Sequence, residues 1–240
     1  MFRLKHDGAA ARLILDRPEA RNAIPLDGWA AFEAVVGEVE ASGARLLVVA
    51  GAGGCFCAGA DLKDFPTLAT DEAARIRFRT AMRGAFDRLA GLAIPTLAII
   101  EGPCFGAGVA LAMACDLRLA RSGAQFAITP AKIGISYPQE DVHRLVALVG
   151  PGQAARLLYT GAAIDGIEAA RIGLAELLDA DEEAVIAAIL ANAPESHVAL
   201  KASIRLAVEG RRSDPGQDDR FDALIAGPEM AARLEALRRK

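Results

Sequence analysis

Short apolar runs alternate with longer amphipathic stretches along the first two thirds of the chain. Phe2 to Lys5 and Arg12 to Leu15 flank Asp7-Gly8, a dipeptide typical of hairpin turns. Continuous apolar runs predict buried strands over residues 46–50, 96–100, 117–120 and 125–128. Apolar residues at helical spacing predict helices over residues 26–40, 71–89 and 106–114. This alternation is typical of an α/β protein.

The pattern after Gly150 is helical almost throughout. Helices are predicted over residues 152–159, 165–172, 181–192, 198–209 and 228–239. Residues 210–218 are polar and contain Gly and Pro, which predicts an exposed linker. We therefore expect a mixed α/β core over residues 1–180 and a helical C-terminal region over residues 181–240.

Composition and charge exclude several classes of protein. Hydrophobic residues make up 53% of the chain and charged residues 24%, as in globular rather than disordered proteins. Charge-free stretches such as 102–115 are interrupted by Gly and Pro and fall short of the ~20 residues that a spanning helix needs, so no membrane partner is expected. The net charge of −4 argues against a nucleic-acid partner.

The cysteines and the first residues bear on location and metal binding. Four cysteines are present without a Cys-x-x-Cys pair, and only three His accompany them, which disfavours a zinc site. The first eight residues lack the apolar stretch of a secretory signal. We expect reduced thiols, no metal and a cytoplasmic protein.

Two glycine-rich segments, 51–62 and 101–111, each follow a predicted strand directly. Gly106-Ala107-Gly108 opens a predicted helix, where free N–H groups and the helix dipole favour negative charge. Two such N–H groups aimed at one oxygen would form an oxyanion hole. Neither segment has the spacing of a dinucleotide loop or a phosphate-binding P-loop, so tight packing without function is the alternative.

The pair of segments, in this order and separation, resembles the crotonase (enoyl-CoA hydratase/isomerase) superfamily. The resemblance runs from residue 15 to about residue 178, and the stretches that carry it include 15–23 (LDRPEARNA), 56–63 (FCAGADLK), 102–111 (GPCFGAGVAL), 158–161 (LYTG) and 169–174 (AARIGL). It implies an α/β fold made of a spiral of ββα turns followed by a helical C-terminal region. It also implies a homo-oligomer, a trimer or hexamer, with residues 181–240 serving in trimerisation and covering the active site.

The resemblance assigns substrate contacts as well. The N–H groups of Ala60 and Ala107 match the two donors that hold the thioester oxygen of an acyl-CoA enolate. Ala58, Asp61 and Leu62 belong to a loop that resembles the family's adenine-binding loop.

Ala20-Arg21 matches the segment where the pantetheine and phosphates pass, and Arg21 is a candidate phosphate partner. Coenzyme A is part of the acyl-CoA substrate, so no tightly bound cofactor is implied.

Two positions depart from the pattern of the family's hydratases. Ala110 and Pro130 stand where the two catalytic glutamates would lie, and neither side chain can transfer a proton. Isomerisation, decarboxylation or lyase chemistry is therefore expected rather than two-glutamate hydration. A non-catalytic acyl-CoA-binding or assembly subunit is the alternative. The chain has no Gly-x-Ser-x-Gly motif, which excludes a serine hydrolase of that type.

The loop 135–144 supplies other titratable groups. Glu140 is the preferred general acid/base, since partial burial beside a substrate would raise its pKa, and Asp141 is the second candidate. Both carboxylates would also suit the first turn of a helix. Tyr137 is expected to line the pocket. With Thr129-Pro130 and His143 it resembles the methylmalonyl-CoA decarboxylase branch, whose tyrosine orients a departing carboxylate. We interpret His143 itself as a structural helix residue.

Overall fold

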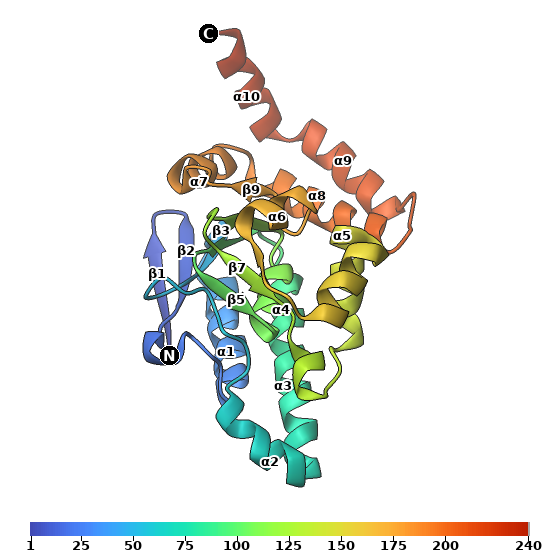
Figure 1. The fold of residues 1–240 in the computed structure, drawn as a ribbon. Helices are drawn as coiled ribbons and strands as arrows, with labels where there is room; N and C mark the ends of the chain where they lie inside the picture. The colour runs from blue at the N-terminus through green and yellow to red at the C-terminus, as the bar shows by residue number, and fades with distance from the viewer. Residues whose placement is uncertain (240) are drawn as a thin grey trace.

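The computed structural model describes residues 1–239, and its centre is a six-stranded sheet (Figure 1). The strand order is β1-β2-β3-β4-β6-β9. β1 pairs with β2 in antiparallel fashion, and the remaining neighbours in this sheet are parallel. The strands are β1 (Phe2–Asp7), β2 (Ala10–Leu15), β3 (Leu46–Gly51), β4 (Thr96–Ile100), β6 (Leu117–Ala120) and β9 (Leu177–Leu178).

A second sheet of three strands is formed by segments that follow strands or helices of the first part of the fold. It consists of β5 (Pro103–Phe105), β7 (Gln125–Ala127) and β8 (Ile164–Asp165), in the order β5-β7-β8. Gly102 adopts a positive φ of 57° between β4 and β5, and a Cβ there would lie 2.1 Å from the Gly54 carbonyl oxygen. Only glycine fits this turn, which sends the chain from the first sheet into the second.

Ten α-helices surround the sheets within the described residues. They are α1 (Gly28–Ala41), α2 (Phe65–Thr70), α3 (Glu72–Gly91), α4 (Ala107–Met113), α5 (Gln139–Thr160), α6 (Gly166–Arg171), α7 (Glu182–Leu190), α8 (Pro194–Val208), α9 (Pro215–Ala226) and α10 (Pro228–Arg238). Short 3-10 turns occupy Pro18–Ala20, Leu62–Asp64 and Pro130–Ile133. In this part of the chain no helix combines the length and apolar character that crossing a membrane requires.

The central strands β3 and β4 are buried on both faces of the main sheet, and their alternate residues point to opposite faces. Leu47 and Val49 of β3 join the large core that includes Trp29 of α1 and Phe86 of α3. Leu46 and Val48 join a smaller cluster that Ile186 of α7 covers on the other face. This double burial explains why β3 and β4 read as continuous apolar runs.

The predicted linker over residues 210–218 is wrong at its C-terminal end. α9 begins at Pro215, and Asp214 accepts a hydrogen bond from the Gln217 N–H at 3.1 Å. An Asp N-cap followed by Pro at the first helical position favours a helix start. The helix predicted over residues 152–159 is the second part of α5, which kinks at Gly150 with φ 73°.

The C-terminal helices extend away from the sheets. α9 and α10 lead outward from α8, and the C-terminal end lies far from the N-terminus (Figure 1). Lys201 of α8 holds this region to the core through an ion pair with Asp116 (2.6 Å) and a hydrogen bond to the Ile94 carbonyl (2.8 Å). The division at residues 180 and 181 stays a prediction, and α7 packs against β3 of the main sheet.

Candidate active site

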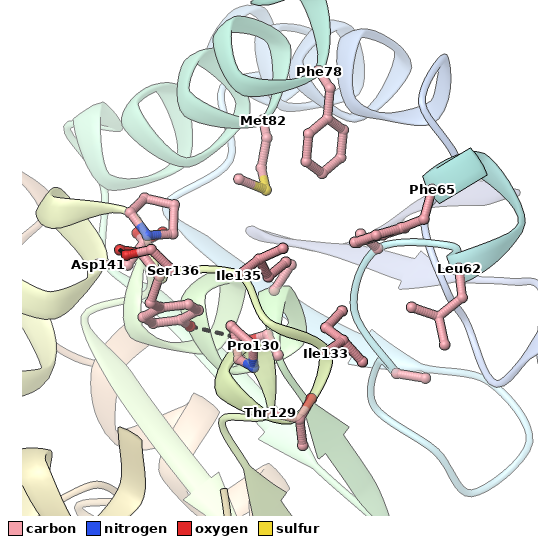
Figure 2. Close-up of a pocket in the computed structure, with 16 residues that line it drawn as sticks. Leu62, Phe65, Phe78, Met82, Thr129, Pro130, Ile133, Ile135, Ser136 and Asp141 are labelled. Atoms are coloured by element: carbon pink, nitrogen blue, oxygen red, sulfur yellow. Dashed lines mark hydrogen bonds between the residues drawn. The ribbon is translucent and has the colours of Figure 1, made fainter. Parts of the chain in front are cut away.

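A cavity of about 150 Å³ lies between α3, the glycine-rich segment after β3 and the loop that leads into α5. Figure 2 shows Phe78 and Met82 of α3 facing Ile133 and Ile135 across it. Sixteen residues line it: Ala58, Ala60, Leu62, Phe65, Phe78, Met82, Gly106, Ala107, Thr129, Pro130, Ile133, Ile135, Ser136, Tyr137, Pro138 and Asp141. Most are apolar, and the two glycine-rich segments meet at this cavity.

Backbone contacts clamp the two segments together. The Phe105 N–H donates to the Cys57 carbonyl at 2.9 Å, and the Cys57 N–H donates to the Pro103 carbonyl at 3.2 Å. A Cβ on Gly59 would lie 3.0 Å from the Ala107 nitrogen, and one on Gly108 would lie 2.2 Å from the Cys57 oxygen. Glycine is required at both positions because the backbones are in direct contact.

The N–H groups of Ala60 and Ala107 are left without an acceptor among residues 1–239. Ala107 is the first residue of α4, so its N–H has no partner within the helix. On either side of Ala60, the Gly59 carbonyl accepts from the Ile24 N–H (2.8 Å) and the Asp61 N–H donates to the Ile24 carbonyl (3.0 Å). Both residues line the cavity, so the structure brings these two predicted donors to one site.

Asp141 lies in the first turn of α5, with its side chain 1% exposed. Its Oδ1 is 3.4 Å from Nη1 of Arg83 and 3.4 Å from Nη1 of Arg144. Its Oδ2 is buried and accepts no hydrogen bond from the described residues. Burial raises the pKa of Asp141 above the ordinary value for aspartate, and the two arginines partly oppose this shift.

Glu140 lies outside this cavity. Its side chain is 60% exposed, 3.8 Å from Arg83 Nη1, and lines a neighbouring cavity, which Tyr137 and Asp141 also line. Since Glu140 is absent from the sixteen lining residues, Asp141 is the only carboxyl group among them. The geometry therefore reverses the order of preference that the sequence suggested. His143 is exposed on α5 and does not line the cavity.

Tyr137 lines the cavity, and its hydroxyl donates a hydrogen bond to the Gly106 carbonyl oxygen at 3.0 Å. The side chain is buried, and burial followed by the nearby Asp141 raises the pKa of the Tyr137 phenol well above its ordinary range. The phenol therefore stays protonated and acts as a donor.

The residues predicted to contact coenzyme A divide into two groups. Ala58 and Leu62 line the cavity, and Leu62 is 66% exposed. The Asp61 carboxylate is turned inward: it accepts from the Lys63 N–H at 3.1 Å and pairs with Arg17 at 2.7 Å. These two bonds lower the pKa of Asp61, which is what a structural carboxylate in a turn would show.

Ala20 and Arg21 do not line the cavity. The Arg21 backbone is left-handed (φ 51°), and its carbonyl accepts from the Ala58 N–H at 2.9 Å, which fixes the loop. The exposed Arg21 side chain forms no ion pair with the described residues. Its proposed contact with phosphate stays a prediction.

The positions of the two missing glutamates differ in their surroundings. Pro130 lines the cavity directly, whereas Ala110 is fully buried inside α4. Within residues 1–239 the four cysteines are free and buried, and no cluster of three metal-binding side chains is present.

Several lining residues escaped the sequence analysis. Phe65 of α2 and Phe78 and Met82 of α3 form the wall opposite the loop 129–136 (Figure 2). Phe78 and Met82 are four residues apart, the spacing of neighbours on one helix face. That signal was present in the sequence, but it is equally typical of core packing.

Comparison with known proteins decides the family. The family model described as enoyl-CoA hydratase/isomerase matches residues 6–217. The chain belongs to the enoyl-CoA hydratase/isomerase family. A short-chain-enoyl-CoA hydratase of Clostridium acetobutylicum is 34% identical over 220 residues, which cover 88% of this chain and 82% of that protein.

Two fungal members of the family are longer than the matched region. Enoyl-CoA isomerase/hydratases of Penicillium crustosum and Mycosarcoma maydis are each 36% identical over 68% of this chain. The matched region spans 19% of the first protein and 62% of the second.

Solved structures of the enoyl-CoA hydratase/isomerase family confirm the predicted α/β crotonase-like fold with its helical C-terminal region. A family protein from Hyphomonas neptunium has a TM-score of 0.91 at 35% identity, covering 99% of this chain and 94% of that one. An enoyl-CoA hydratase/carnithine racemase from Magnetospirillum magneticum has a TM-score of 0.92 at 28% identity, covering 99% and 92%.

Proposed function

We propose that this chain is an acyl-CoA enzyme that isomerises the double bond of an enoyl thioester, with Asp141 as its single acid/base. The observation that carries the proposal is that Asp141 is the only carboxyl group among the lining residues of the cavity, which also include Ala60 and Ala107, whose N–H groups have no acceptor among the described residues. An enolate needs a place for its negative oxygen and one group that takes and returns a proton.

The proton balance of isomerisation fits a single carboxylate. The ionised Asp141 removes a proton from the α-carbon of a 3-enoyl thioester, and the electron pair moves to the thioester oxygen. The N–H groups of Ala60 and Ala107 hold that oxygen. The protonated Asp141 then delivers the proton to the γ-carbon, which gives the 2-enoyl thioester and restores the carboxylate.

Hydration makes a different demand. Addition of water to a 2-enoyl thioester needs one group to activate the water and another to protonate the α-carbon. Pro130 offers no such group in the cavity, and Ala110 is buried within α4. We therefore infer that isomerisation is favoured over two-glutamate hydration.

The environment of Asp141 suits a proton-transfer group. Its Oδ2 is buried and has no hydrogen-bond partner among the described residues, and Asp141 lines a largely apolar cavity. Burial raises its pKa toward the working range of a general base, while Arg83 and Arg144 limit that rise. A carboxyl group in this setting can exist in both protonation states during a catalytic cycle.

Decarboxylation and lyase chemistry are alternatives that use the same enolate. The resemblance to the decarboxylase branch gave Tyr137 the role of orienting a departing carboxylate. The Tyr137 hydroxyl, however, already donates its proton in a hydrogen bond to the Gly106 carbonyl. This engagement favours isomerisation. A non-catalytic acyl-CoA-binding subunit would retain the same cavity without turnover.

The coenzyme A part of a bound substrate would extend out of the cavity across an apolar rim. Leu62, Ile133 and Ile135 all line the cavity yet remain substantially exposed. A bound pantetheine would cover part of this surface, which would stabilise the complex through burial of apolar area. We place the phosphates beyond this rim, near the exposed Arg21.

A panel of thioesters tests the proposal. We expect turnover of 3-enoyl-CoA to 2-enoyl-CoA, and hydration of crotonyl-CoA at least about 100-fold slower, because one of the two acid/base groups is missing. Methylmalonyl-CoA and 3-hydroxyacyl-CoA complete the panel. The isomerase proposal would be contradicted if hydration were faster than isomerisation. It would also be contradicted if the protein turned over methylmalonyl-CoA alone or 3-hydroxyacyl-CoA alone. Binding without any turnover would favour the non-catalytic alternative.

A further inference from the structure

The hydrogen bond from Tyr137 to Gly106 reaches the same peptide group that carries one of the two N–H donors. The Gly106 carbonyl and the Ala107 N–H belong to a single planar peptide unit and point in opposite directions. The Tyr137 hydroxyl bonds the carbonyl at 3.0 Å, drawn as a dashed line in Figure 2, while the N–H is left without an acceptor at the cavity.

The backbone at Gly106 is unusual. Its φ of 52° and ψ of −118° belong to a region that side-chain-bearing residues rarely adopt. The Gly106 N–H donates to the Ala127 carbonyl at 2.8 Å, and the Gly106 carbonyl also accepts from the Val109 N–H at 3.0 Å. Backbone bonds thus define the turn, and Tyr137 adds a side-chain bond from the loop before α5.

We propose that Tyr137 is a positioning residue that orients and polarises the Gly106–Ala107 peptide, so that the Ala107 N–H binds a thioester oxygen more strongly. The inference rests on the proposed function, since it deepens the role of the same N–H pair. A carbonyl that accepts a hydrogen bond draws electron density from its own amide, which makes the N–H a stronger donor. Such cooperative strengthening is about 10–30% per bond.

The burial of Tyr137 protects its hydrogen bond to the Gly106 carbonyl from competition by water. The side chain is buried beside Asp141, where water cannot readily compete for the Gly106 carbonyl. Loss of the hydroxyl would leave the ring in place and the carbonyl with its backbone donors. The expected effect is therefore on the strength of the N–H donor rather than on folding or on coenzyme A affinity.

The spectrum of the thioester carbonyl tests this role directly. Butyryl-CoA carrying ¹³C at the thioester carbonyl is bound to the protein, and its infrared stretching band is compared with that of the free compound. We expect a shift to lower frequency in the wild type and a smaller shift in Tyr137→Phe. Turnover of 3-enoyl-CoA should fall about 10-fold, less than the 100-fold or more for a deleted donor, with KM within about twofold.

The sequence supplies a matched control. The chain contains two tyrosines, and the second, Tyr159, is 82% exposed on α5. Tyr159→Phe should leave the carbonyl band and the turnover at wild-type values. If Tyr137→Phe fails to fold, 3-fluorotyrosine at both positions preserves the shape of the ring. A more acidic hydroxyl should then increase the shift of the carbonyl band.

The outcomes separate this inference from the proposed function. Absence of any shift in the wild type would contradict the N–H pair and hence the proposed function. A wild-type shift that Tyr137→Phe fully retains would overturn the positioning role, even if turnover fell. A carbonyl band that does not respond to 3-fluorotyrosine would overturn it as well.

Discussion

Asp141 and Glu140 are neighbours in the sequence, yet their carboxyl groups lie in different surroundings. Successive residues on an α-helix point about 100° apart, and of the two only Asp141 lines the cavity with Ala60 and Ala107. Asp141 is buried there, whereas Glu140 is exposed beside Arg83. The sequence identified both candidates but could not give the rotation of α5 about its axis, which depends on packing against α4 and on ion pairs with Arg83 of α3.

The charges around Asp141 predict the pH dependence of activity. Arg83 of α3 and Arg144 of α5 lower its pKa, while burial and Glu140 raise it, and burial is the largest effect. A general base must be ionised, so kcat/KM should rise with pH through a pKa above the ordinary value of about 3.9 for aspartate. Arg83→Met removes a stabilising cation and should move this rise to higher pH.

Measurement of kcat/KM for isomerisation against pH checks this expectation. Arg79→Met is the control, because Arg79 lines the neighbouring cavity with Arg83 but forms no ion pair with Asp141. Its profile should match the wild type. A rise that stays in place in Arg83→Met, or that moves to lower pH, would exclude the proposed electrostatic coupling.

At the scale of elements, the long and regular ones were predictable. β3, β4, α1 and α3 each carry an uninterrupted pattern, and the structure places them within two residues of the predicted bounds. β8 and β9 are two residues long and exist because neighbouring strands pair with them. Such strands have no local signature. α9 was missed because its polar first turn resembles a linker.

The family resemblance predicted a homo-oligomer, and the exposed faces of α8–α10 offer a surface on which copies could associate. Leu200, Phe221 and Leu237 are each at least 60% exposed and surround an apolar hollow formed by these helices. Exposed apolar surface of this kind marks interaction sites, and we propose a second copy of this chain as the occupant. Light scattering after gel filtration should give the mass of a trimer or hexamer.

A charged substitution tests which face associates. Phe221→Glu should shift the protein to smaller species, because burying an unpaired carboxylate costs several kcal/mol. Ile76→Glu is the control, since Ile76 is 48% exposed on α3, outside this hollow. A monomeric wild type, or an unchanged mass for Phe221→Glu, would rule out this interface.

For the whole molecule, the fold brings together parts that no single segment contains. The two N–H groups come from segments after β3 and β5, the carboxyl group from α5 and the apolar wall from α2 and α3. The resemblance of the two glycine-rich segments to the crotonase superfamily predicted both N–H donors, because that resemblance rests on local sequence. It could not select the proton-transfer group, which depends on where α3 and α5 lie around the cavity.

Deuterium incorporation tests the central claim, that Asp141 moves the proton of an enolate held by the N–H pair. A 3-enoyl-CoA is incubated in D₂O with each protein, and deuterium at the α- and γ-carbons is followed by NMR. The wild type and Glu140→Gln should exchange and isomerise at similar rates. Asp141→Asn should bind the thioester yet exchange at least about 100-fold more slowly. Exchange at the wild-type rate in Asp141→Asn, or its loss in Glu140→Gln alone, would contradict this account.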